Sequence, residues 1–113
     1  MSLNDLSLSP KQRNALREIK EKASNQFPIN KTIVYGSVAR EEAEPESDLD
    51  VLILTEYSFS HKEKHEIYAI VTEINLKYET NLSVLIVEEE KWENGICSVL
   101  PIKDDVKKQG IRF

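Results

Sequence analysis

Four residues in the first half of the chain have the types and spacing needed for phosphate chemistry. Gly36 and Ser37 directly follow a β-branched and aromatic run over residues 32–35, and Asp48 and Asp50 come soon after them. A glycine at the end of a strand lets a ligand approach the backbone closely. Ser37, at the start of a helical turn, can hold an anion such as a phosphate through its hydroxyl and the free backbone N–H groups.

Asp48 and Asp50 are separated by one residue at the start of an apolar run over residues 49–54. Side chains alternate faces along a strand, so both carboxylates point the same way while their apolar neighbours point into the core. Two adjacent carboxylates repel each other unless a cation lies between them, and such hard oxygen ligands suit Mg²⁺ or Mn²⁺. Each feature alone is more often a plain turn or a solvated acidic pair. Together they indicate the anion site and metal site that phosphoryl or nucleotidyl transfer requires.

The elements that position these residues follow from turn signals and apolar spacing. We expect, in chain order, a helix over Pro10–Gln26, a strand over 32–35, a helical turn and exposed loop over 37–47, a strand over 49–54, a helix opened by the capping box of Ser60 and Glu63, a strand over 82–87, a helical turn over 88–93 and a helix over Pro101–Gln109. This order predicts an α/β or α+β domain, with a small mixed β-sheet of three to four strands flanked by helices.

Length and composition indicate one globular domain spanning residues 1–113, with 40% hydrophobic residues for its core. The net charge of -5 argues against stable nucleic-acid binding but allows a nucleotide, because a divalent metal can bridge carboxylates and phosphates. The single cysteine, Cys97, precludes a disulfide framework within the chain and fits a reducing compartment. Without a signal peptide or a membrane-length apolar stretch, we expect a cytoplasmic protein with no membrane association.

The segment Gly36-Ser37-Val38-Ala39-Arg40, followed by Ser47-Asp48-Leu49-Asp50, resembles the signature of the nucleotidyltransferase superfamily with the DNA-polymerase-β-like fold. The resemblance covers most of the chain and is strongest to the minimal nucleotidyltransferase (MNT) domains of the MntA-like antitoxin type. It implies the polymerase-β-like palm fold, a nucleoside triphosphate such as ATP held by Gly36 and Ser37, and Mg²⁺ or Mn²⁺ held by the catalytic pair Asp48 and Asp50. Arg40 would brace the loop.

The chain departs from the family pattern at two positions. Glu41 stands where the family often has a glycine, which affects loop shape. Ser83 aligns with a third carboxylate that the family usually carries on a neighbouring strand, here residues 82–87, and the nearest acids, Glu79 and Glu88, flank that strand. Serine is a weak metal ligand and a poor base at neutral pH. The enzyme is therefore expected to be slow, to recruit a carboxylate from a partner, or to have lost catalysis.

Three functions remain open. The first is metal-dependent transfer of AMP from ATP to a hydroxyl acceptor; the resemblance implies a HEPN-domain toxin as partner, with one of its tyrosines as acceptor. The second is a catalytically weak or inactive nucleotide-binding antitoxin subunit that neutralises its partner by direct binding. The third is transfer to a small molecule such as an aminoglycoside, for which a homodimer would have to build the acceptor cleft. The sequence leaves a homodimer and a hetero-complex as alternatives.

Other residues favour structural interpretations. His61 and His65 share a helix face, but no further ligands accompany them as a zinc site would require. Tyr57 and Trp92 fit packing or a subunit contact. The acidic run Glu88-Glu89-Glu90 fits a helix N-terminus, where negative charge is favourable.

Overall fold

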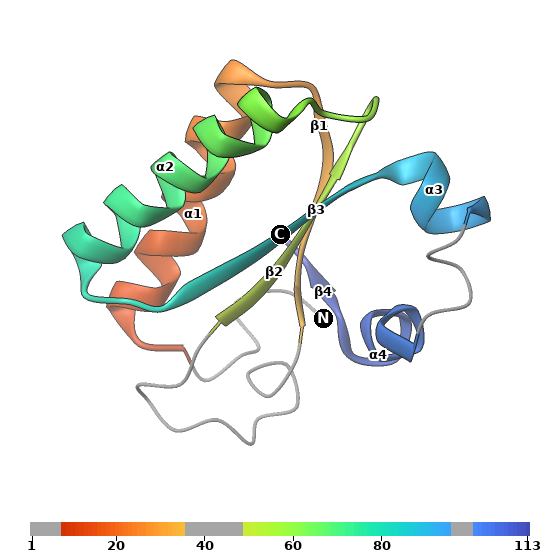
Figure 1. Ribbon diagram of the computed structural model, residues 1–113. Coiled ribbons are helices and arrows are strands. Elements are labelled where there is room, and N and C mark those ends of the chain that lie inside the picture. Colours follow the sequence, from red (N-terminus) through yellow and green to blue (C-terminus); the bar gives the residue numbers. More distant parts are fainter. Residues whose placement is uncertain (1–7, 36–48, 96–100) are drawn as a thin grey trace.

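The computed structural model describes residues 8–35, 49–95 and 101–113, which form a four-stranded mixed sheet with helices on both faces (Figure 1). The elements are, in order, α1 (Pro10–Gln26), β1 (Ile29–Tyr35), β2 (Leu49–Thr55), α2 (His61–Tyr78), β3 (Leu82–Glu88), α3 (Glu89–Asn94), α4 (Pro101–Gln109) and β4 (Ile111–Arg112). The strand order is β3-β2-β1-β4. β1 is antiparallel to β2 and to β4, whereas β2 and β3 are parallel and joined through α2. The expected fold class is confirmed.

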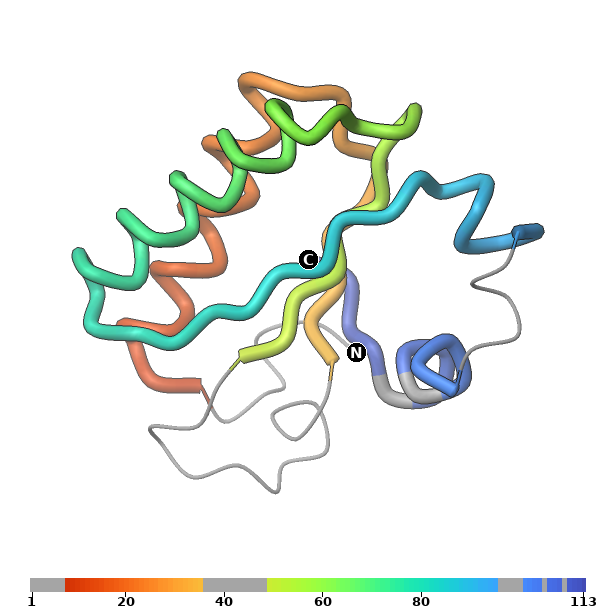
Figure 2. Tube along the Cα trace, in the orientation of Figure 1, coloured from red at the N-terminus to blue at the C-terminus, as the bar shows by residue number. Residues whose placement is uncertain are grey.

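The helices α1 and α2 lie side by side over one face of the sheet (Figures 1 and 2). Each begins with a capping box, made by Ser9 with Gln12 in α1 and by Ser60 with Glu63 in α2. The side chains that face the helices alternate along the strands and form the larger core cluster, which includes Leu16, Ile19, Val34, Leu49, Val51, Ile53, Ile67 and Ile74. This face supplies most of the buried apolar surface.

The opposite face carries α3 and α4 and a smaller core cluster (Figure 1). Leu52 and Leu54 of β2 pack there against Trp92 of α3 and Val106 of α4. Trp92 is therefore a packing residue, while Tyr57 is partly exposed and donates a hydrogen bond from its hydroxyl to Glu63 Oε2 at 2.7 Å. The acidic run Glu88-Glu89-Glu90 forms the start of α3, as expected.

The boundaries predicted for α1 and α4 agree with the structure, whereas the predicted strands were too short. β1 begins three residues earlier than expected, at Ile29, and β3 continues to Glu88. The fourth strand, β4, was not expected as a separate element. It is formed by two residues whose pairing with Ile33 and Val34 depends on a distant part of the chain. The rings of His61 and His65 do share a face, with centroids 5.9 Å apart.

No helix among the described residues is both long enough and apolar enough to cross a membrane.

Candidate functional site

Asp50 lies near the start of β2 on the face that α3 and α4 partly cover. Its Cα is in register with Tyr35 on β1 and with Ser83 on β3. Residues in register on neighbouring strands point to the same face, with strands about 4.8 Å apart. The sheet therefore aligns Tyr35, Asp50 and Ser83 in one row across three strands. The side chains on either side of Asp50 in β2, Leu49 and Val51, point to the other face and are fully buried.

Tyr35 is a site neighbour that the sequence analysis did not single out. Its ring packs against the smaller core cluster, and it is partly buried beside the carboxylate. Burial, and after it the negative charge of Asp50, raises the pKa of the Tyr35 hydroxyl above its ordinary value. Tyr35 therefore stays protonated at neutral pH and forms a neutral wall next to Asp50. The signal in the sequence was its position as the last residue before Gly36, but only the strand register shows that it faces Asp50.

Ser83 is exposed and stands next to Asp50 on the parallel neighbour β3. The strand's only carboxylate, Glu88, is in register with Thr55 at the other end of β2. It lies five positions along β3 from Ser83, so its side chain points to the opposite face. Within the described chain, the row that contains Asp50 therefore has one carboxylate, with a hydroxyl on the β3 side.

The remaining predicted site residues, Gly36, Ser37 and Asp48, lie outside the described residues, as do Arg40 and Glu41. Gly36 is the residue after the end of β1, and Asp48 is the residue before the start of β2. The end of β1 and the start of β2, which flank segment 36–48 in the sequence, are adjacent in the sheet at the row of Asp50.

The donor atoms around Asp50 fit a divalent metal only if further ligands complete its coordination. Asp50 is half-buried and offers hard oxygen atoms, and the hydroxyl of Ser83 is one strand away. No group of three or more potential metal ligands occurs among residues 8–35, 49–95 and 101–113. A metal held at Asp50 would therefore draw its other ligands from Asp48, water and substrate phosphate, as Mg²⁺ commonly does.

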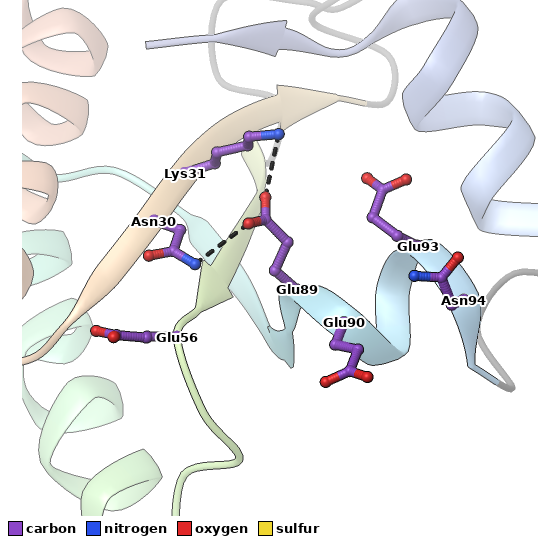
Figure 3. A pocket seen from close by; sticks show the side chains of 7 residues that line it. All are labelled: Asn30, Lys31, Glu56, Glu89, Glu90, Glu93 and Asn94. Atoms are coloured by element: carbon purple, nitrogen blue, oxygen red, sulfur yellow. Dashed lines mark hydrogen bonds and ion pairs between the residues drawn. The ribbon is translucent and has the colours of Figure 1, made fainter.

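A separate pocket of about 460 Å³ lies at the opposite end of β2 (Figure 3). It is lined by Asn30, Lys31, Glu56, Glu89, Glu90, Glu93 and Asn94. Glu89 bridges its wall, accepting a hydrogen bond from the Asn30 amide at 3.2 Å and pairing with Lys31 Nζ at 3.0 Å. Glu56 comes directly after β2, whereas Asp50 is near its start, so this pocket is remote from the predicted chemistry. Among its acidic residues, Glu89 has the structural role of joining α3 to β1.

The chain belongs to the Polymerase beta, Nucleotidyltransferase family, which matches residues 17–98. This range contains the Gly36-Ser37 pair, both aspartates and all of the first three strands. The fold and the family match thus agree on a nucleotidyltransferase domain.

Individual proteins are also similar to this chain. A protein of Methanocaldococcus jannaschii named "putative protein adenylyltransferase" is 38% identical over 61 residues, which cover 54% of this chain and 62% of the relative. The match therefore spans less than two thirds of that relative's length. Among solved structures, one described as "toxin-antitoxin with AMP-PNP" has a TM-score of 0.60 at 11% identity and covers 92% of this chain and 72% of its own. A "putative minimal nucleotidyltransferase" has a TM-score of 0.59 at 18% identity, covering 93% and 97%. At these identities the structural likeness establishes the fold.

Proposed function

We propose that this domain transfers AMP from ATP to a hydroxyl acceptor, with release of pyrophosphate, in a reaction that depends on a divalent metal. The observation that carries the proposal is the placement of Asp50. It lies half-buried in a sheet of the nucleotidyltransferase fold, one residue beyond Asp48 and opposite the strand that leads into Gly36 and Ser37. The family match supports nucleotidyl transfer, and the name of the Methanocaldococcus relative supports ATP as donor.

Each predicted residue has a distinct role in this proposal. The backbone of Gly36 and the N–H and hydroxyl of Ser37 hold the triphosphate. Asp48 and Asp50 hold Mg²⁺ or Mn²⁺. The bound metal supplies charge neutralisation and orientation of the phosphate groups. Tyr35 limits the access of water to Asp50 from the β1 side, which strengthens the electrostatic interactions of that carboxylate.

The acceptor that we favour is a tyrosine hydroxyl on a partner protein of the HEPN type. The name of the Methanocaldococcus relative supports a protein acceptor, and the solved toxin–antitoxin complex with the same fold supports a toxin–antitoxin context. We place this reaction in the cytoplasm, where ATP and Mg²⁺ are present.

The acceptor hydroxyl must lose a proton during transfer, and Ser83 is a poor base for this step. Ser83 is exposed at the side of the row, so a partner bound there can bring its own carboxylate close to Asp50. We therefore expect transfer by the isolated chain to be slow and to increase when the partner is bound.

The alternative is an antitoxin subunit that binds nucleotide and neutralises its partner by contact alone. The serine in the row beside Asp50 favours this alternative, because within the described residues the row contains a single carboxylate. Under this alternative, neutralisation of the partner would survive Asp48→Asn in the absence of nucleotide.

The test is calorimetric titration of the protein with ATP, with and without Mg²⁺. We expect ATP binding that requires Mg²⁺ and is lost in the double variant Asp48→Asn/Asp50→Asn. Glu56→Gln is the matched control, because it removes one carboxylate at the far end of β2. Equal binding by the double variant would refute the metal-ligand assignment. No binding by the unaltered protein at millimolar ATP would refute nucleotide transfer by the isolated domain.

A further inference from the structure

The outer side of β3 is an open sheet edge with a defined hydrogen-bonding pattern. In the part of the chain that the structure describes, β3 pairs only with β2. Leu49 N–H donates a hydrogen bond to Asn81 O at 2.9 Å, and this bond identifies which residues of β3 direct their backbone groups towards β2. In such a ladder alternate residues bond to the neighbouring strand. Ser83, Leu85 and Val87 therefore turn their backbone groups towards β2, while the residues between them turn theirs outward.

The first outward position on this edge is already closed by a side chain. Asn75 of α2 accepts a hydrogen bond from Leu82 N–H at 2.8 Å and donates one to Leu82 O at 3.2 Å. This contact confirms the outward direction of the backbone at Leu82. It leaves Val84 and Ile86 as the next outward positions, each with one donor and one acceptor. The open part of the edge is thus short and precisely bounded at one end.

The open edge lacks the usual protection against strand pairing. Isolated edges commonly carry lysine, proline or a bulge that prevents another strand from pairing with them. From Leu82 to Val87 there is no charged residue, no proline and no glycine. Leu85, at the centre of this run, is 37% exposed on the face that carries Asp50. An exposed leucine in an uncharged edge strand indicates a surface that another strand covers.

The neighbouring side of α2 has the same character. Lys77 pairs with Glu18 of α1, whereas Asn75 contacts β3, and these two contacts identify which side of α2 faces which neighbour. Helical spacing then places Lys64, Tyr68 and Thr72 on the side towards the β3 edge. Tyr68 is 41% exposed, and this side of α2 carries no carboxylate between Lys64 and Asn75. Two copies of an acidic chain can therefore approach here without carboxylates of this stretch meeting.

We propose that a second copy of this chain pairs with β3 in antiparallel orientation, about a two-fold axis at Leu85. In this register Val84 of each copy lies opposite Ile86 of the other, and the outward donors and acceptors of both residues are satisfied reciprocally. Leu85 meets its own counterpart as a non-hydrogen-bonded pair, where side chains approach most closely. Moving the axis one residue back would place Leu82 opposite Ile86, and the Asn75 cap blocks that pairing.

Pairing at this edge joins the two sheets into one sheet of eight strands. Ser83, Leu85 and Asp50 share a face, so both copies of the candidate site would lie on the same side of the joined sheet, near the axis. The inference depends on the strand register and the edge composition, and it is independent of the proposed transfer reaction. Dimerisation can fail while nucleotide binding succeeds, and the reverse.

Sedimentation equilibrium of the full chain without nucleotide tests the inference, over roughly 10 to 500 µM to allow for a small interface. We expect a mass that rises towards twice the 13.0 kDa of one copy. Leu85→Lys should remain monomeric over this range. Leu76→Lys is the matched control, since Leu76 is 78% exposed on α2 and points away from both the sheet and the edge, and it should dimerise normally. A wild-type protein that is monomeric throughout, or a Leu85→Lys variant that dimerises equally well, overturns the inference.

Amide exchange of the unaltered protein provides a second test, which does not depend on a variant folding. At high concentration the Val84 and Ile86 amides should be protected, and on dilution their exchange should accelerate, while the Ser83 and Leu85 amides stay protected by β2. Rapid exchange of Val84 and Ile86 at every concentration would show that the edge is open in solution and would exclude the pairing.

Discussion

The two faces of β2 differ in what they contribute to the molecule. On one face, Leu49, Val51 and Ile53 are fully buried beneath α1 and α2. On the other face, Leu52 and Leu54 are buried under α3 and α4, but Asp50 near the strand's start is only partly covered. Burial on the second face therefore decreases along the strand towards Asp50.

This difference shows how a small domain can combine a stable core with a reactive edge. Alternation along β2 assigns the odd positions to the larger core cluster, and on the other face only the first position, Asp50, lies outside the smaller cluster. A carboxylate would be costly in the middle of either core cluster. At the start of β2 it remains accessible to water and to ligands. The expected separation of stability from chemistry can be tested by variants on each face.

The largest expected effect is on the packed face. Ile53→Ala should lower the free energy of unfolding by about 2–5 kcal/mol, because the side chain is fully buried in the larger core cluster. Denaturant titration measures this loss. Nucleotide binding should persist under conditions where the variant is folded. A loss below about 0.5 kcal/mol, the scale of ordinary surface substitutions, would contradict the assignment of this face to stability.

On the face of β2 that carries Asp50, the expected effect is on the rate of AMP transfer. Asp50→Asn should reduce transfer by about 100-fold or more, since metal ligation contributes several kcal/mol to such reactions. Its free energy of unfolding should change by about 1 kcal/mol or less, because the side chain is only partly buried. Rates of AMP incorporation and denaturant titration, measured on the same preparation, give both values. A variant with full transfer would remove Asp50 from the site.

A smaller gain is expected at the neighbouring strand. Ser83→Asp places a carboxylate next to Asp50, at a position that is exposed and can accept it. If the missing base limits the rate, transfer should increase by roughly tenfold or more, which is less than the roughly 100- to 10,000-fold that a well-positioned general base contributes. Ser83→Asn is the control of similar size without charge. Equal rates for the two variants would show that the base comes from elsewhere.

The smallest expected effect concerns Tyr35. Burial raises its pKa most, and the charge of Asp50 adds to this, so Asp50→Asn should lower the pKa of Tyr35 but leave it above the ordinary value. NMR titration of the tyrosine rings measures this change. Glu63→Gln, which removes the hydrogen-bond partner that raises the pKa of Tyr57, is the control and should leave Tyr35 unchanged. A Tyr35 pKa that does not respond to Asp50→Asn would contradict their proximity.

The raised pKa of Tyr35 also predicts the direction in which the stability of the fold changes with pH. A tyrosine with a raised folded-state pKa stabilises the fold fully below about pH 10, its unfolded value, and this contribution is lost as the pH rises through the folded pKa. Thermal unfolding of Tyr35→Phe should therefore lose less stability than the unaltered protein above about pH 10.

Much of the fold could be predicted because its signals are local. Ser9 and Ser60 mark the starts of α1 and α2 through backbone hydrogen bonds within one turn. The apolar stripe of α2 repeats at helical spacing. In contrast, β4 has two residues and no pattern of its own, so no local signal could reveal it. Its formation depends on Ile33 and Val34 being presented by a distant strand.

For the candidate site, the sequence showed which residue types could take part, but it did not show which of these residues are neighbours in space. The alternation rule placed Asp50 on the face opposite Leu49, Val51 and Ile53, and the structure confirms this. That Tyr35 faces Asp50 depends on the register between β1 and β2, which the types of these residues do not reveal. Ser83 lies beside Asp50, as its alignment with the family pattern suggested. The roles of Gly36, Ser37 and Asp48 remain predictions.

The pairing of β4 with β1 has a consequence for the order of folding. β2, α2 and β3 follow one another directly, whereas β4 must return to β1 from the far end of the described chain. Closing a longer loop costs more entropy, and distant contacts slow the search for the native state. We expect the β2–α2–β3 unit to assemble early and the two residue pairs of β4 to form last. In the native protein the same pairs should be the first part of the sheet to open transiently.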